Sequence, residues 1–219
     1  CCFSHILKTC SRWLMSSTKP TIDKSKKIPR SLNVFKKHVK RMVKGNELFW
    51  SIVPENVKRN INKYLIINRQ DARRQPVKDN VIDIQITSSP YVTSYEYADL
   101  HQLTTIWLEP EVDLKEYKKQ FIGTSAKTNG TRILKSQIGK DIENKLQKVD
   151  KKMADEVEAF FVDIQECFDE TYRILKDSGR CCYVIGNTKL KGVDIFNAEV
   201  FAESMRYSGL KIDRIIKRE

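Results

Sequence analysis

Three short apolar runs that each end in a polar turn restrict the fold of this chain more than any other feature. They occupy residues 64–67, 81–88 and 181–186, and each predicts a β-strand. Apolar residues recur every three or four positions over 142–175, which predicts one long helix that Gly179 would close. Strands that alternate with helices favour an α/β fold around a mostly parallel sheet.

Two further elements are predicted near the C-terminus. Residues 197–207 have the spacing of a helix that Gly209 would end, and residues 212–216 predict a fourth, shorter strand. A run as continuously apolar as 183–185 is typical of a strand that is covered on both faces. We therefore assign residues 63–219 to one α/β domain.

The first part of the chain differs from this domain in charge. Residues 1–80 carry 19 Lys and Arg against 5 Asp and Glu, whereas residues 81–219 carry 21 against 23. A basic half joined to a neutral half indicates a polyanionic partner that meets mainly the first part. We define residues 1–62 as a basic helical segment.

Two helices are predicted within this segment, on either side of a basic loop. The first covers 3–17, and 18–29 is a polar loop with two prolines. The second helix would start with Ser31 as its N-cap and be interrupted or ended at Gly45. Its buried stripe would consist of Leu32, Phe35, Val39, Met42 and Val43.

The six cysteines favour neither a disulfide framework nor a zinc site. A chain this long needs no disulfides, and adjacent Cys pairs with three scattered histidines lack the ligand spacing of zinc. They fit small buried apolar residues in a reducing cytoplasm. The chain has no run of about 18 apolar residues and no signal-peptide pattern. We expect a cytoplasmic protein without a metal or a membrane span.

The polar turns after the three strands are candidates for a binding crevice. They comprise Asp71-Ala72-Arg73, residues 87–91 and residues 186–188. Ligands of open α/β sheets bind at the carboxyl ends of the strands, so three such turns would meet around one ligand.

The second of these turns carries a specific resemblance. Residues 86–91, Ile-Thr-Ser-Ser-Pro-Tyr, resemble the Thr-Ser-Pro-Pro-Tyr signature of the amino-directed DNA methyltransferases, bacterial site-specific enzymes that modify cytosine N4 or adenine N6. Residues 92–108 are similar to the segment that follows the signature in one branch of the family. Residues 71–73 stand where that family has a Gly-Asp-Ala-Arg turn, and residues 179–187 resemble its later strand and turn.

This resemblance implies methyl transfer from S-adenosylmethionine to the exocyclic amine of a base in double-stranded DNA. The lone pair of such an amine is delocalised into the ring, so the amine is a poor nucleophile. The Ser88 hydroxyl and the Ser89 carbonyl would bind its hydrogens and free the lone pair for attack on the sulfonium methyl. Pro90 would fix the turn, and Tyr91 would stack on the flipped base. The absence of a Pro-Cys pair from the sequence argues against carbon-5 methylation.

The resemblance also implies further contacts. The cofactor would be bound by Asp71, Ala72 and Thr87. The base or the DNA would be contacted by Tyr95, Tyr97, His101 and Asn187. Among these, His101 fits a hydrogen-bonded helix residue better than a catalytic base. Residues 121–139, which are polar and contain three glycines, are a candidate DNA-facing loop.

Two departures from the family pattern concern the cofactor and the turn. Ser89 replaces the first proline, which keeps the carbonyl but removes a φ restraint. The eight glycines are not clustered, and the glycine-rich strand end of the family, Asp-Pro-Phe-x-Gly-x-Gly, is missing from the sequence. In the branch that the chain resembles, this element would precede Cys1. We therefore expect a partial Rossmann-like methyltransferase sheet in a fragment or split subunit, with a second chain supplying the glycine-rich motif.

Three alternatives remain at this point. Serine at position 88 favours cytosine N4 over adenine N6 as the target. The chain could instead be a catalytically degenerate homologue that only binds nucleic acid. Methylation of RNA or protein is the third possibility, because the same chemistry serves other planar amines.

Overall fold

The computed structural model describes residues 2–17, 20–92, 97–109, 113–123 and 133–217. The chain divides into two compact units. Unit 1 comprises Cys1–Arg69 and Glu96–Leu114, and unit 2 comprises Gln70–Tyr95 and Lys115–Glu219. The predicted domain boundary after residue 62 stays a prediction.

Unit 1 is helical in its described residues. Its helices are α1 (Cys2–Leu7), α2 (Ser31–Ile52), α3 (Glu55–Arg59), α4 (Ile61–Tyr64), α5 (Tyr97–Leu100) and α6 (Gln102–Leu108). The short helix α1 packs on both α2 and α6. His5 stacks on His38 of α2 at 4.6 Å between ring centroids, and Phe3 meets Trp107 of α6 edge-on at 5.8 Å.

The predicted first helix of unit 1 is wrong in length. It ends at Leu7. Trp13, which was predicted to be helical, forms an isolated antiparallel bridge with Ile22 of the predicted loop. Trp13 is buried, and Lys26 donates to the carbonyls of Lys8 and Trp13 at 2.8 and 2.9 Å. This stretch is therefore a folded loop held by a buried indole and a lysine.

The predictions for α2 are wrong in three respects. Its first helical residue is Ser31, the N-cap is Arg30, and no side chain caps the helix. The helix also continues through Gly45, where an added Cβ would have no described atom within 4 Å. Glycine thus weakens the helix without ending it. All of α2 is described and none of its residues is buried, because α1 covers only part of it, so the predicted buried stripe is also wrong.

The predicted strand at 64–67 does not form. Tyr64 ends α4, and the described residues 65–67 belong to no strand. Ile66 and Ile67 are 79% and 84% exposed. An apolar β-branched run becomes a strand only where another strand satisfies its backbone groups, and this run has no such partner among the described residues.

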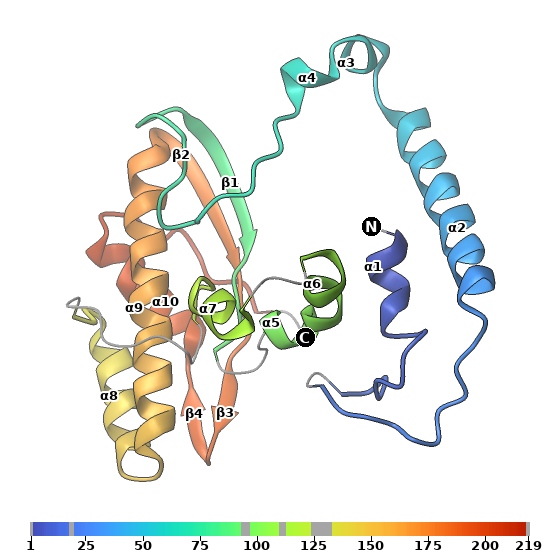
Figure 1. The fold of residues 1–219 in the computed structure, drawn as a ribbon. Helices are drawn as coiled ribbons and strands as arrows, with labels where there is room; N and C mark the ends of the chain where they lie inside the picture. Colours follow the sequence, from blue (N-terminus) through green and yellow to red (C-terminus); the bar gives the residue numbers. More distant parts are fainter. Residues whose placement is uncertain (1, 18–19, 93–96, 110–112, 124–132, 218–219) are drawn as a thin grey trace. The chain divides into compact units, whose positions relative to one another are not determined.

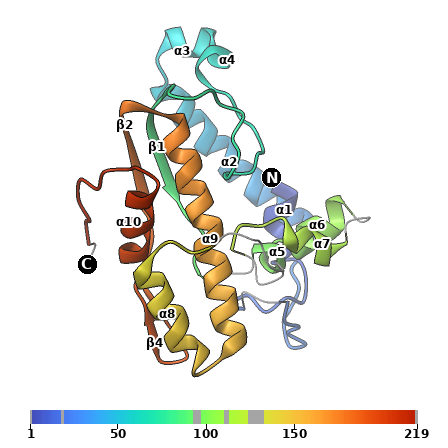
Figure 2. The same cartoon turned by 90° about the vertical axis from the view of Figure 1, so that its left-hand side faces the viewer.

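Unit 2 contains two small sheets and several helices (Figures 1 and 2). The strands are β1 (Ile82–Ser88), β2 (Leu175–Val184), β3 (Thr188–Leu190) and β4 (Val193–Ile195). The helices are α8 (Gln137–Gln147), α9 (Lys151–Ile174) and α10 (Asn197–Tyr207), and α7 (Leu114–Lys119) begins at the last residue assigned to unit 1. Strands β1 and β2 pair in parallel, and β3 and β4 form an antiparallel hairpin.

The core of unit 2 is built around α9, which runs back along the β1–β2 pair and leads directly into β2 (Figure 1). Helices α8 and α10 both pack on it. Its apolar stripe is fully or nearly fully buried and supplies Ala154, Val157, Phe160, Phe161, Ile164 and Phe168. The Phe168 ring lies edge-on to Tyr183 at 5.1 Å and to Phe201 at 5.2 Å.

The strand and helix predictions for unit 2 are mostly confirmed. The strand at 81–88 is β1, the run at 181–186 lies largely in β2, and α10 has the predicted bounds. Gly209 follows α10 at φ 95°, and the Leu210 amide donates to the Met205 carbonyl, as in a glycine-terminated helix. The parallel β1–β2 pair fits an α/β fold, and the Rossmann-like arrangement stays a prediction.

Three predictions for unit 2 are wrong. Residues 142–175 form two helices, because the Asp150 side chain accepts from the Met153 amide at 3.1 Å and starts α9 anew. Gly179 lies inside β2, where an added Cβ would come within 2.9 Å of the carbonyls of Ile82 and Lys176. The described residues 212–216 form no strand.

Candidate base and cofactor site

The ends of β1 and β2 bring two of the three predicted turns together. Ser88 and Val184 are register partners in the parallel pair, so the chain leaves both strands at the same edge. A Cβ added to Gly186 would lie 3.5 Å from Cε1 of Tyr91. The turn after β2 therefore lies beside the Tyr91 ring, and a Cβ at residue 186 would make only an ordinary van der Waals contact with it.

Burial differs sharply along the turn after β1. Ser88 is exposed, Pro90 and Tyr91 are half-buried, and Val92 is fully buried. Ser89 is only 5% exposed, and its buried Oγ has no hydrogen-bond partner among the described residues. The Ser88 hydroxyl is thus open to a ligand, whereas the Ser89 side chain points into the protein. Thr87 is half-buried opposite Tyr183.

Asn187 has a structural role in the turn at residues 186–188, after β2. Its Oδ1 accepts from the Ala198 amide at 3.1 Å, and its Nδ2 donates to Oε2 of Glu199 at 3.2 Å. These bonds cap the first turn of α10. The fully buried Asn197 donates from Nδ2 to the Gly186 carbonyl at 2.8 Å and fixes the glycine that faces Tyr91. Sequence reasoning missed this role of Asn197, because its partner carbonyl lies 11 residues earlier in the chain.

The predicted cofactor turn, residues 71–73, lies in the same unit. Asp71 and Ala72 are exposed. The Arg73 guanidinium donates to both carboxylate oxygens of Asp71, from Nε at 3.0 Å and from Nη2 at 2.6 Å. Its Nη1 donates to Oδ1 of Asp163 on α9 at 2.9 Å. Hydrogen bonding to Asp71, and then attraction to both carboxylates, raises the pKa of Arg73 well above its ordinary value despite partial burial.

A second buried acid on α9 holds the chain between this turn and β1. Oε1 of Glu170 accepts from the Gln75 amide at 2.6 Å, and Arg173 pairs with Glu170 while donating to the Val77 carbonyl at 2.8 Å. The hydrogen bond from Arg173 is the main cause that lowers the pKa of Glu170. Sequence reasoning missed Asp163, Glu170 and Arg173. Acids at the edge of the apolar stripe of α9 were the available signal.

Two of the remaining predicted contact residues belong to unit 1, so their contact with the base or the DNA stays a prediction. Tyr97 is the first residue of α5 and His101 is the N-cap of α6, and both belong to unit 1. The His101 carbonyl accepts from the Thr105 amide at 2.9 Å, which agrees with a helix residue. Tyr95 lies outside the described residues, as do 124–132 of the predicted DNA-facing loop.

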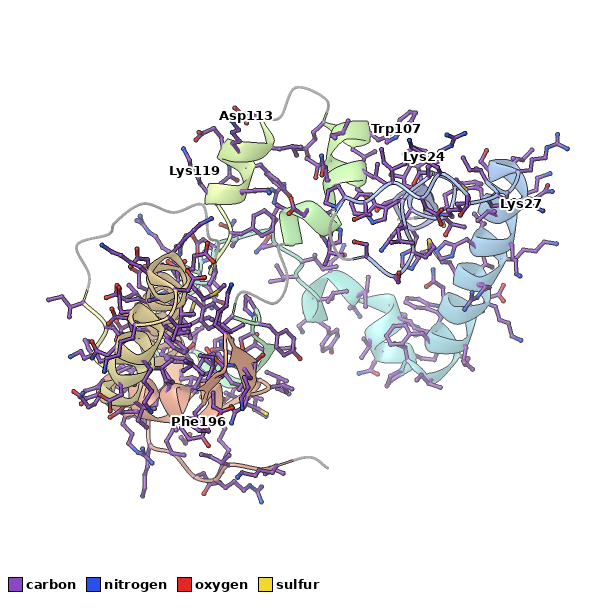
Figure 3. The ribbon with its side chains drawn as sticks, turned by 90° about the horizontal axis from the view of Figure 1, so that it is seen from below. Lys24, Lys27, Trp107, Asp113, Lys119 and Phe196 are labelled. Atoms are coloured by element: carbon purple, nitrogen blue, oxygen red, sulfur yellow. The ribbon has the colours of Figure 1, made fainter. Side chains whose placement is uncertain are left out.

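A cavity of about 300 Å³ opens beside the turn at residues 186–188, on the β3–β4 hairpin. It is lined by Asn187, Thr188, Lys189, Asp194, Ile195 and Phe196. Phe196 is 44% exposed and offers an aromatic face there (Figure 3). Lys189 is ion-paired to Asp194 at 3.0 Å, so its charge is already balanced.

The basic surface of unit 1 follows α2 and the stretch before it. Lys24 and Lys27 are exposed on that stretch (Figure 3). The exposed basic residues of α2 are Lys36, Lys37, Lys40, Arg41 and Lys44. Such a density of solvated cations on one helix suits a phosphate backbone.

The described residues provide neither a metal site nor a disulfide. No three His, Cys, Asp or Glu side chains there are placed to hold a metal ion. The five described cysteines are free thiols, and Cys182 is exposed, against the expectation that all are buried. Burial raises the pKa of the Cys167 thiol to about 12. The described helices include none of the length and apolarity that crossing a bilayer requires.

Comparison with known proteins adds evidence from outside the chain. Over 191 residues, the chain is 30% identical to M.MvaI of Kocuria varians. The similarity is to a type II methyltransferase. The aligned part is 79% of this chain but 42% of that relative, so the chain spans less than half of the relative's length. No family model matches the chain, and no solved structure does.

Proposed function

We propose that the chain carries the target-base half of an S-adenosylmethionine-dependent DNA methyltransferase that modifies an exocyclic amine. One observation carries the proposal: the exposed Ser88 and the Tyr91 ring lie at the carboxyl end of β1, against the Gly186 turn that ends β2. Homology to a type II methyltransferase supports the same reading.

The turn would act on the amine through its polar groups. The Ser88 hydroxyl and the Ser89 carbonyl accept the two amine hydrogens, which returns the lone pair to the nitrogen. The Tyr91 ring stacks on the base after it leaves the duplex. Ser88 at the first position motivates cytosine N4 as the preferred target over adenine N6.

The cofactor would supply the sulfonium methyl. Asp71 offers an exposed carboxylate for the hydroxyls of its adenosine. Ala72 of the same turn and Thr87 of β1 are the other proposed cofactor contacts. The glycine-rich backbone that would hold the rest of the cofactor is missing from the sequence. We therefore propose that the site is completed by a glycine-rich element, on a longer form of this protein or on a second polypeptide, within a cytoplasmic restriction-modification enzyme.

Double-stranded DNA is the proposed substrate. The exposed lysines of α2 and of the stretch before it would lie along phosphates and add affinity without sequence preference. Binding should therefore weaken steeply as salt rises.

The test is methyl transfer from labelled S-adenosylmethionine to duplex DNA, by the chain alone and with a polypeptide that carries the glycine-rich element. Ser88→Ala should reduce the rate about a hundredfold, because it removes a polar group aimed at the reacting amine. Ser178→Ala, at an exposed serine near the start of β2 and outside the proposed contacts, serves as a control with little effect on the rate. Failure of the wild-type protein to methylate any DNA, both alone and with the glycine-rich polypeptide, would refute the proposed methyltransferase activity.

The same assays decide between the alternatives. A degenerate homologue would bind DNA but show no heat on calorimetric titration with S-adenosylmethionine in either form. An RNA methyltransferase would prefer RNA over duplex DNA in competition at matched salt.

A further inference from the structure

We propose that Asp163 is a positioning residue whose one carboxylate holds two segments of unit 2 that lie far apart in the sequence. One segment is the turn that carries Asp71, and the other is the backbone at Gly123. The proposal rests on the proposed function only in giving Asp71 a contact with the cofactor.

The contacts form a continuous chain. Oδ1 of Asp163 accepts from Nη1 of Arg73, and its Oδ2 accepts from the Gly123 amide, both at 2.9 Å. The same guanidinium grips Asp71 through Nε and Nη2. Asp163 thus links a turn 90 residues before it with a backbone amide 40 residues before it.

Burial makes this link specific. Asp163 is 6% exposed, and a buried carboxylate is tolerated only when charge and hydrogen bonds compensate it. Arginine is the residue that can do so here, because its planar fork donates to two carboxylates at once, whereas a lysine ammonium would not span them in that geometry.

The approach of Gly123 is equally constrained. Its φ is 71°, and an added Cβ would lie 2.4 Å from Cδ2 of Phe160. Only glycine lets this backbone come close enough to α9 for its amide to reach Asp163. Residue 123 lies in the stretch 121–139 that the sequence predicts to face DNA. The carboxylate that sets the Asp71 turn therefore also sets the backbone near the start of that stretch.

Glu170 provides a matched control on the same helix. It is 7% exposed, is charged, and accepts from a backbone amide of the same connecting segment, that of Gln75. Its contacts hold residues 75–79 and not the Asp71 turn or Gly123.

The experiment measures hydrogen exchange of individual amides in the full chain without cofactor. In Asp163→Ala, the Gly123 amide loses its charged acceptor, so its exchange should accelerate about tenfold to a hundredfold. The Arg73 amide donates to Oδ1 of Asp71 at 2.9 Å, and its exchange should also accelerate because the Asp71 turn loses the guanidinium's anchor on α9. The Gln75 amide should change little. In Glu170→Ala the pattern should reverse. Unchanged exchange at Arg73 and Gly123 in Asp163→Ala, or equal acceleration of all three amides in both variants, would overturn the proposal.

Arg73→Lys covers the case in which Asp163→Ala does not fold. It keeps a positive charge beside Asp163 but loses the fork, so exchange should accelerate at residue 73 while Gly123 stays protected. Acceleration at Gln75 to the same extent would contradict the proposed positioning role of Asp163.

A cofactor measurement on the assembled enzyme separates this proposal from the proposed function. Asp163→Ala should raise the KM for S-adenosylmethionine about tenfold or more with a smaller change in kcat, and Glu170→Ala should not. Equal increases in both variants would reduce Asp163 to a structural role. Absence of cofactor binding by the wild-type protein would refute the proposed function. The exchange pattern would still test whether Asp163 holds the Asp71 turn and Gly123.

Discussion

The two faces of the β1–β2 pair carry opposite kinds of side chain. On the face that α9 covers, Tyr183 Oη lies 2.7 Å from Thr171 Oγ1 of α9 and accepts from Gln85 Nε2 at 3.3 Å. On the other face, Ile84, Ile86 and Val184 are 66%, 75% and 45% exposed. The covered face is thus partly polar and hydrogen-bonded, whereas the open face exposes three large apolar side chains beside Ser88 and Arg180.

This contrast shows that packing on α9 depends on more than hydrophobicity. Side chains alternate between the faces of a strand, so a slip of one residue would bury Ile86 and expose its neighbour Thr87. Such a slip is unfavourable because it would separate the Gln85 amide from the Tyr183 hydroxyl, and the Tyr183 hydroxyl from Thr171 of α9. Parallel strands are usually covered on both faces, which makes the open apolar face the unusual one.

Removal of the ring that seals the covered face should have the largest effect. Phe168 is fully buried between Tyr183 and Phe201, so Phe168→Ala should lower the free energy of unfolding by about 3–5 kcal/mol. Urea denaturation followed by circular dichroism measures it. A loss no larger than that of Ile86→Ala on the open face would contradict the contrast.

Loss of one hydroxyl from the covered face should have a smaller effect. Tyr183→Phe leaves the Gln85 amide and the Thr171 hydroxyl without this partner and should cost about 1–2 kcal/mol in urea denaturation. Tyr172→Phe, at a tyrosine that is 55% exposed, is the control and should change little. Equal costs for the two variants would mean that the network does not hold the sheet on α9.

Alkaline pH should probe the same hydroxyl in the wild-type protein. Burial, the largest cause, raises the pKa of Tyr183 above its ordinary value of 10.0. A phenol whose folded pKa is raised stabilises the fold fully below pH 10, and this contribution falls as the pH rises from there towards the folded pKa. Thermal melts between pH 9 and about 11 should therefore show a loss that is smaller in Tyr183→Phe. The same loss in both proteins would assign it to other groups.

A substitution on the open face should have the smallest effect on stability. Ile86→Thr keeps a β-branched side chain and should change the free energy of unfolding by less than about 0.5 kcal/mol, since Ile86 is mostly exposed. It should also reduce aggregation, measured by light scattering, because the open face is apolar. A loss of 2 kcal/mol or more, on the order of a core truncation, would mean that the face is covered in solution.

Local patterns were sufficient to predict several elements. Strand β1, most of β2, and α10 with its terminal Gly209 follow from apolar runs and helix-ending residues that lie next to each other in the chain. The break at Asp150 was also visible as a capping residue, although one helix was predicted across it. Strand order also indicated that the turns after two strands would meet, and the turn at residues 87–91 does lie beside Gly186, while the role of that turn stays a prediction.

Signals local to the chain therefore specify the elements that were predicted correctly and the turn that resembles the methyltransferase signature. Three features came from the folded protein alone: residues 64–67 lie outside the described strands, Ile84 and Ile86 face outward, and Asp163 joins Arg73 to Gly123. Pairing, burial and charge compensation depend on partners that lie tens of residues away. A residue's own neighbours in the chain do not specify those partners.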